Sequence, residues 1–249
     1  MSKLTVILPA AGRGTRLNLP YPKEILRLDK EQALIDYSFD FFKDYGRNEV
    51  EFVVVINEDK TEILEYLAKY KDRYNISFTY QNPNELEYTG AIKSAKHLFG
   101  KNNVVLLPDT IMKLPTNIDL LKEVTTSLKA TGFTFLYKEE TNPDMLKTKG
   151  ALYIDHEGKV ILYEDKPEFN GTNDYESFNA FWCSFAFTKE VFNDCIAFME
   201  KSTLKQHVNA KDIATTPIFK SKGIKVNDYM DLGTWQEIRK LLSTHEGEY

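Results

Sequence analysis

The sequence contains few of the residues that build metal centres and disulfide frameworks. Among its 249 residues are two cysteines and four histidines. Cys183 and Cys195 lack the spacing of a metal or redox motif, and so few cysteines suggest a reducing compartment. The histidines show no ligand spacing either. We therefore expect neither a zinc site nor a thiol redox centre nor a disulfide framework.

Long apolar runs and an excess of positive charge are also missing. No apolar run approaches transmembrane length, and the one at residues 4–8 is too short for a signal peptide. The formal net charge is −5, which argues against a nucleic-acid partner held through its phosphates. We therefore expect a cytoplasmic protein that binds neither membranes nor nucleic acids. A local basic pocket could still hold a nucleotide.

Three familiar motifs are absent. The Walker A string G-x-x-x-x-G-K-[ST] does not occur, and Leu17 stands where the third glycine of the dinucleotide fingerprint G-x-G-x-x-G should be. No G-x-S-x-G elbow is present, so an α/β-hydrolase is unsupported. Repeats and low-complexity segments are absent as well.

Hydrophobic periodicity predicts an α/β fold. Apolar runs predict strands that alternate with amphipathic helices, which indicates βαβ units and a mostly parallel sheet. The expected strands are 4–8, 52–56, 76–80, 104–107 and 133–137, and the expected helices are 34–45, 61–70, 90–99 and 118–128. Further elements are a hairpin of 151–154 and 160–163, a strand 178–187, helices 189–199 and 212–220, a strand 224–229 and a closing helix 234–244.

The loop after the first strand has the composition of a phosphate-binding loop. Gly12 and Gly14 lack a Cβ atom, so backbone N–H groups could approach an anion closely. Arg16 and Lys23 would add full positive charges. An ordinary strand-to-loop turn with solvated basic residues would contain the same glycines.

The complete string from residue 4 to residue 28 resembles the signature of the sugar nucleotidyltransferases, which runs from a strand into G-x-G-T-R-[LM] and then P-K. The P-K-E-I-L segment is closest to the UDP-glucose pyrophosphorylase version, and A-A-G is shared with several cytidylyltransferases. The resemblance implies a Rossmann-like, mostly parallel mixed sheet flanked by helices. It implies one domain, 1–249, with a nucleotide-binding half (1–140) and an acceptor-binding half (141–249). The loop residues expected to bind nucleotide are Pro9, Ala10, Ala11, Gly12, Arg13, Gly14 and Thr15.

Two aspartates are candidate magnesium ligands. Asp109 follows a predicted strand, and ligands of open parallel sheets sit at the carboxyl ends of strands. Asp231 begins the string D-L-G-T-W, which resembles the second metal position of the family. One Mg²⁺ shared by both carboxylates and the nucleotide is what the resemblance implies. The alternatives are a turn residue for Asp109 and, for Asp231, a turn before Gly233 with Thr234 capping the last helix.

Gln81 and Gly90 match the positions that recognise the base in this family. Gln81 ends a predicted strand, and Gly90 begins the next helix. In the family, the glutamine binds a pyrimidine edge and the glycine lets the base approach the backbone. A surface position is the alternative for Gln81.

The acceptor half matches the family in part. Asp165 and Lys166, followed by proline, resemble the motif E-K-P, whose lysine holds the acceptor phosphate. Gly150 matches a glycine that faces the sugar, and Asn179 begins a string in which Cys183 replaces the usual glycine. The phosphate contact is therefore preserved, whereas the residues for hexose recognition differ. A solvated surface lysine is the alternative for Lys166.

The implied reaction transfers a nucleotidyl group, with Arg16, Lys23 and Lys166 as the catalytic residues. A pyrimidine nucleoside triphosphate reacts with a sugar 1-phosphate, pyrophosphate leaves, and the product serves polysaccharide biosynthesis. A second interpretation is a cytidylyltransferase acting on phosphocholine, a phosphonate or a similar compound, which Asp165 and Cys183 favour. A third is a catalytically silent nucleotide-binding homologue. Homo-oligomer formation stays open.

Overall fold

The first strand forms the middle of the sheet in the computed structural model, which describes residues 3–85, 87–169 and 177–245. Strand β1 (Leu4–Pro9) pairs in parallel with β2 (Val50–Ile56) on one side and with β4 (Asn102–Val105) on the other. Val6 and Ile7, which point to opposite faces, are both completely buried. A strand buried on both faces explains why the run lacks polar alternation.

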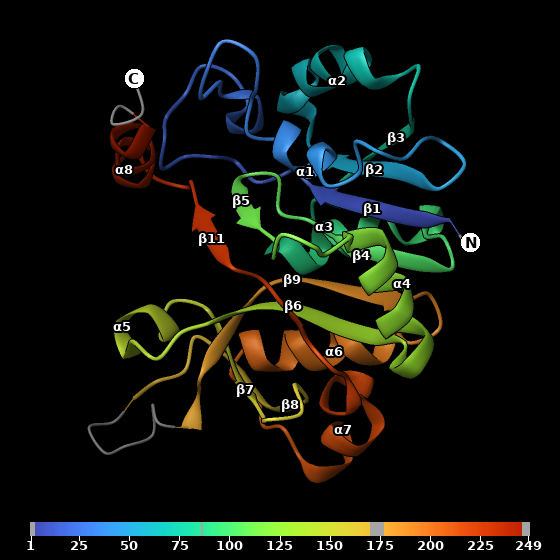
Figure 1. Ribbon diagram of the computed structural model, residues 1–249, viewed down its shortest axis with the longest axis vertical. Helices are drawn as coiled ribbons and strands as arrows, with labels where there is room; N and C mark the ends of the chain where they lie inside the picture. Colours follow the sequence, from blue (N-terminus) through green and yellow to red (C-terminus); the bar gives the residue numbers. More distant parts are fainter. Residues whose placement is uncertain (1–2, 86, 170–176, 246–249) are drawn as a thin grey trace.

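The sheet is mixed, and its order is β10–β6–β9–β4–β1–β2–β3 (Figure 1). Strand β3 (Asn75–Tyr80) continues the parallel part beyond β2. Strand β9 (Ala180–Thr188) lies antiparallel between β4 and β6 (Phe133–Glu139), and β10 (Ile224–Lys225) is parallel to β6. The two predicted halves of the chain therefore share one sheet. The expected mixed, largely parallel α/β fold is confirmed.

Two smaller β units lie beside this sheet. The hairpin of β7 (Gly150–Ile154) and β8 (Val160–Asp165) joins it through β9, as the sequence predicted. Strands β5 (Thr110–Lys113) and β11 (Asp228–Asp231) form a separate antiparallel ribbon. In Figure 1, β1 points toward the side on which this ribbon and α8 (Trp235–His245) lie.

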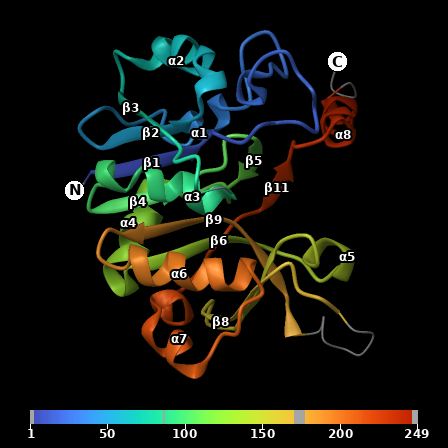
Figure 2. The same cartoon turned by 180° about the vertical axis from the view of Figure 1, so that it is seen from behind.

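Helices cover both faces of the sheet. One face packs against α1 (Asp36–Asp40), α2 (Glu62–Leu67) and α4 (Leu120–Thr131). The other face, toward the viewer in Figure 2, packs against α3 (Glu87–Ser94) and α6 (Phe192–Thr203). The remaining helices are α5 (Pro143–Leu146) and α7 (Ala210–Thr215). Within the described ranges, no helix has the length and apolar character needed to cross a membrane.

A third hydrophobic cluster ties the start of the chain to α8. Leu17 and Leu26 pack with Ile238 and Leu241 of α8. Both leucines belong to the opening loop, which is the segment between β1 and α1. The indole Nε1 of Trp235 also donates a hydrogen bond to the backbone oxygen of Leu17, at 3.0 Å. The opening loop is therefore positioned by a helix from the far end of the sequence.

Several predicted elements differ from the structure. The helices expected at 61–70 and 90–99 are α2 and α3, each followed by a 3₁₀ turn (Ala68–Tyr70 and Lys96–Leu98). The helix expected at 34–45 is the five-residue α1, and the strand expected at 104–107 ends at Val105. The helix expected at 212–220 is two elements, α7 and a 3₁₀ turn Pro217–Lys220. Proline disfavours a helical backbone in the residue before it, so α7 ends ahead of Pro217. The strand expected at 224–229 splits into β10 and β11, which belong to different sheets, and β5 was not predicted.

Candidate active site

The opening loop is fixed at its start and open at its tip. The N–H of Ala10 donates to Val55 O at 2.8 Å, and Asn57 Nδ2 donates to Ala11 O at 2.7 Å. A Cβ added to Gly12 would meet no atom within 4 Å, and Gly14 has the left-handed φ of +63°. In the part of the chain that the structure describes, no residue accepts a hydrogen bond from the N–H groups of residues 12–15. The tip therefore presents amide donors of the kind that bind anions.

Lys23 connects this loop to Asp109. Its aliphatic stem lies beside Gly14, where an added Cβ would be 3.6 Å from the Lys23 Cγ and Cδ atoms. Its ammonium forms an ion pair with Asp109 Oδ2. Two residues that the sequence assigned to the same site are thus in direct contact.

A buried ion pair supports the backbone under Lys23. Lys60 Nζ binds both carboxylate oxygens of Glu24, at 2.7 and 2.8 Å, and the two side chains are 5% and 1% exposed. Burial raises the pKa of Glu24 and lowers that of Lys60, while their mutual attraction opposes both shifts. No sequence motif indicates this pair.

Replacing Lys60 by methionine should lower the free energy of unfolding by about 3–5 kcal/mol, because it leaves the Glu24 carboxyl buried without its partner. The double variant Lys60→Met, Glu24→Leu should recover most of this loss, since it removes both charges. Urea unfolding of the wild type, the single variant and the double variant measures both effects. A single variant as stable as the wild type would contradict this account.

The β5–β11 ribbon brings Asp109 and Asp231 together. Asp231 lies opposite Thr110 in the ribbon, and the N–H of Leu232 donates to Asp109 O at 3.0 Å. The expectation that Asp109 directly follows a strand is wrong, because β4 ends at Val105. Asp109 lies in the turn between β4 and β5, which a 2.9 Å hydrogen bond from Thr110 Oγ1 to Leu107 O closes.

Asp231 has positive groups around it. Lys149 Nζ lies 2.8 Å from Oδ2, and the N–H of Gly233 donates to Oδ1 at 3.1 Å. An added Cβ on Gly233 would come within 2.9 Å of Arg16 Nη2. Burial alone would raise the pKa of Asp231, but Lys149, the Gly233 amide and Arg16 outweigh it and lower the pKa. Glycine at 233 therefore lets the Arg16 guanidinium approach the aspartate.

The two carboxylates fit a magnesium ion that completes its coordination with phosphate oxygens and water. Mg²⁺ prefers oxygen ligands and commonly takes one or two carboxylates together with substrate phosphates. Among the residues described, no group of three or more His, Cys, Asp and Glu side chains could hold a metal ion. Asp109 and Asp231 would therefore depend on the nucleotide for the remaining ligands. The magnesium site itself stays a prediction.

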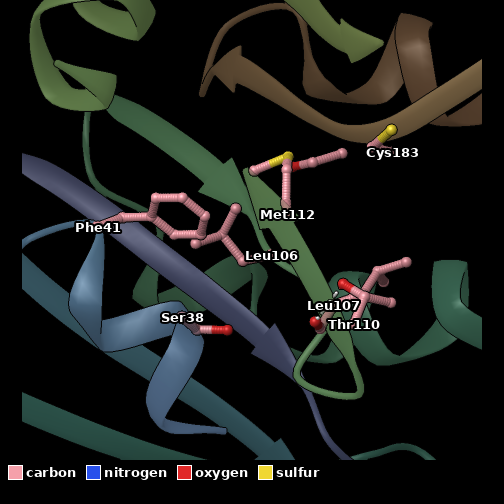
Figure 3. A pocket seen from close by; sticks show the side chains of 8 residues that line it. Ser38, Phe41, Leu106, Leu107, Thr110, Met112 and Cys183 are labelled. Atoms are coloured by element: carbon pink, nitrogen blue, oxygen red, sulfur yellow. Dashed lines mark hydrogen bonds between the residues drawn. The ribbon is translucent and has the colours of Figure 1, made fainter. Parts of the chain in front are cut away.

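A small pocket lies behind the Asp109 turn (Figure 3). The buried thiol of Cys183 lines it, and burial raises the pKa of that thiol. The cysteine that replaces the usual glycine thus lines the pocket behind the Asp109 turn. The lining residues are Ser38, Phe41, Leu106, Leu107, Thr110, Met112, Cys183 and Ser184.

Gln81 organises the loop that precedes α3. Its Nε2 donates to Glu85 O at 2.8 Å and to Glu87 O at 3.1 Å. A Cβ on Gly90 would lie 1.9 Å from Glu85 O, so only glycine permits this loop to rest on α3. Because both amide N–H groups are engaged, Oε1 is the Gln81 atom left to accept a hydrogen bond from a base.

The side chain of Trp182 covers Gly150. A Cβ there would lie 1.8 Å from Trp182 Nε1, so the indole rests directly on the glycine. The ring centroids of Trp182 and Tyr88 are 5.6 Å apart. Trp182 Nε1 and the hydroxyls of Tyr88 and Tyr163 are buried without a hydrogen-bond partner in the described structure. Three polar groups near Gly150 are thus unsatisfied within the described residues.

Asp165 and Lys166 end the β7–β8 hairpin. The Asp165 side chain is buried, and burial raises its pKa although Lys166 and Lys205 oppose the shift. Lys205 Nζ donates to Lys166 O at 2.8 Å, and the N–H of Lys166 donates to Lys149 O at 2.8 Å. These contacts hold the backbone of Lys166 in a left-handed conformation with its side chain exposed.

Asn179 joins two strands. Its Oδ1 accepts from the N–H of Ile154 at 2.8 Å, and its Nδ2 donates to Ile154 O at 2.7 Å. Its amide is therefore engaged with the backbone of β7, and its contact with an acceptor stays a prediction.

Lys149, Trp182 and the Glu24–Lys60 pair were not identified from the sequence. Lys149 directly precedes Gly150, and this position was the one available signal. Trp182 lies inside the string that begins at Asn179, but its contact with Gly150 depends on how β7 pairs with β9.

Solved structures share this fold. A UDP-glucose pyrophosphorylase complexed with UDP-glucose superposes with a TM-score of 0.75 and 17% identity over 100% of both chains. A putative glucose-1-phosphate thymidylyltransferase from Bacillus anthracis, in complex with sucrose, gives 0.70 and 16% over 98% of this chain and 95% of that one. A UTP-bound UGPase from Acinetobacter baumannii gives 0.68 and 16% over 100% and 95%. The fold is therefore that of the nucleotide-diphospho-sugar transferases.

The sequence itself defines the family. Residues 4–246 match the family of nucleotidyl transferases, and the chain belongs to it. No curated protein matches the chain.

Proposed function

We propose that the protein is a magnesium-dependent enzyme that joins a pyrimidine nucleoside triphosphate to a sugar 1-phosphate and releases pyrophosphate. The observation that carries this proposal is the β5–β11 ribbon, which places Asp109 and Asp231 beside Lys23 and Arg16. The open amides of residues 12–15 lie in the loop between β1 and Lys23. Family membership and the solved neighbours, which include a complex with UDP-glucose, support the same activity.

The proposed reaction is an in-line displacement at phosphorus. An oxygen of the acceptor phosphate attacks the α-phosphorus, the bond to the β-phosphate breaks, and pyrophosphate leaves with the electron pair. Both reactants are anionic, so positive groups must offset their repulsion and the charge on the leaving group. Arg16 and the loop amides would hold pyrophosphate, Lys23 the α-phosphate and Lys166 the acceptor phosphate. A phosphate oxygen is already ionised at neutral pH, so no general base is needed.

Asp109 and Asp231 are the residues that would hold Mg²⁺. The bound ion would neutralise charge on the triphosphate. The ion pairs with Lys23 and Lys149 hold both carboxylates in place.

Pyrophosphate release tests the proposal. ATP, CTP, GTP, UTP and dTTP would each be combined with a panel of sugar 1-phosphates and small phospho-alcohols, with and without Mg²⁺. Release that requires Mg²⁺, a pyrimidine triphosphate and a sugar 1-phosphate is the expected result. No release with any pair would make the protein a silent nucleotide-binding homologue.

Gln81→Ala should reduce the discrimination between pyrimidine and purine triphosphates by about 10-fold or more, because a polar group built to pair with one base edge rejects other edges. The ratio of kcat/KM for the best pyrimidine and purine triphosphates measures the effect. The control is Gln206→Ala, which removes the same side chain from an exposed position. Unchanged selectivity would place base recognition elsewhere.

The position of Trp182 favours a second candidate, transfer to a small non-sugar phospho-compound such as phosphocholine or a phosphonate. The indole occupies the surface of Gly150 that a sugar ring would need. Trp182→Ala should then raise kcat/KM for hexose 1-phosphates by about 10-fold or more relative to small acceptors, since even one methylene group in a pocket changes specificity by about 10-fold and the indole is much larger. Thermal melting verifies that the variant folds. A wild-type enzyme that already prefers hexose 1-phosphates would exclude this candidate.

A further inference from the structure

Lys149 places a charged group at the centre of the site although it belongs to none of the family motifs. Its Nζ lies 2.8 Å from Asp231 Oδ2 and 5.6 Å from the ring centroid of Tyr229. Its side chain is only 19% exposed. The aromatic ring and the carboxylate therefore hold the ammonium in a defined place.

Lys149 is also the backbone neighbour of Lys166. The N–H of Lys166 donates to Lys149 O at 2.8 Å, just where β7 and β8 pair Gly150 with Asp165. The two lysines thus leave adjacent strands at the same end of the hairpin. Lys149 is directed to Asp231, and Lys166 is exposed.

Three cationic side chains lie around the two aspartates, one more than charge pairing requires. Asp109 is paired with Lys23, and Asp231 is surrounded by Lys149, Arg16 and the amide of Gly233. Without Lys149, Asp231 would still have Arg16 and an N–H donor. The site therefore carries a surplus of positive charge in a protein whose net charge is −5. Such a local surplus attracts anions.

We propose that Lys149 is a further phosphate-binding residue and that it forms, with Lys166, a clamp for the phosphate of the acceptor. This inference rests on the proposed function, which assigns Lys166 to that phosphate. An ammonium has three donors, so Lys149 can keep its bond to Asp231 and donate another to a phosphate oxygen. Lys149 then links the acceptor phosphate to one of the two aspartates.

Anion binding in the absence of turnover tests the clamp. The dissociation constants of inorganic phosphate and of pyrophosphate would be measured by calorimetry for the wild type and for Lys149→Gln. A second variant, Lys149→Met, keeps the apolar stem against Tyr229. The matched control is Lys147→Gln, which removes an exposed lysine paired with Asp144 on the same connection. Circular dichroism and melting curves verify folding.

Removal of the Lys149 charge should weaken phosphate binding by about 10- to 100-fold, the range for a hydrogen bond to a charged group, while the control binds normally. Pyrophosphate binding, assigned to Arg16 and the loop, should change by less than about 2-fold. The clamp would be overturned by unchanged phosphate affinity or by equal losses of affinity for both anions. It would also be overturned if the wild type bound no phosphate or if both variants unfolded. If the clamp is confirmed but no triphosphate yields pyrophosphate, the proposed function fails and Lys149 remains an anion-binding residue.

Discussion

Lys23→Ala should lower kcat by about 10²-fold or more, the scale of removing one preorganised charge-stabilising group. The Lys23 ammonium is paired with Asp109, and its stem lies beside Gly14 of the anion-binding loop. The substitution removes a positive charge from the expected position of the α-phosphate and leaves Asp109 without its partner. Pyrophosphate release with the preferred substrate pair measures the effect.

The matched control is Lys122→Ala, which breaks an exposed ion pair with Asp119 on α4. Exposed pairs contribute little, so this variant should keep normal kcat and nearly normal stability. Near-normal turnover of Lys23→Ala would show that Lys23 is not part of the reacting site, whatever its contact with Asp109.

Asp109→Asn and Asp231→Asn should each lower turnover by about 10²-fold, and the double variant should lose little more, because residues that act as a unit are not additive. Each substitution preserves the shape of the side chain and removes one of the charges that would bind Mg²⁺. Turnover, the Mg²⁺ concentration for half-maximal rate and the melting temperature would be measured for all three variants.

The contrasting view treats Asp231 as a turn residue, and its hydrogen bond from the Gly233 amide agrees with such a role. Asparagine serves that role equally well, so Asp231→Asn would then keep its turnover and its Mg²⁺ dependence. Asp228→Asn is the control, because Asp228 lies on the same strand and pairs with Lys138. Normal turnover of Asp231→Asn would exclude the two-aspartate site.

The parts of this protein that the sequence predicted are those set by local pattern. Strand β1 was visible as an apolar run, and the β7–β8 hairpin as two runs around a turn. The proximity of Arg16, Lys23, Asp109 and Asp231 was anticipated through a resemblance, and the structure brings these residues together. Local composition alone does not predict that these four residues lie close together.

The parts that were missed depend on pairing between distant segments. Strand β5 has only four residues, and its partner strand β11 lies more than a hundred residues later. Val226 donates its N–H to Tyr137 O and Asn227 to Lys113 O, so neighbouring residues bond to different sheets and the predicted strand divides between them. Lys149 and Trp182 reach Asp231 and Gly150 only after these pairings form.

The cluster that joins the opening loop to α8 bears on the order of folding. Leu17 and Trp235, which share a hydrogen bond, are 218 residues apart in the sequence. During synthesis the loop leaves the ribosome long before α8 exists, and contacts across such a separation form late because the chain between them must first be ordered. The central strands can pair earlier, but the loop that would hold the triphosphate acquires its final support last. A nascent chain can therefore pair its central parallel strands before its anion-binding loop is fully supported.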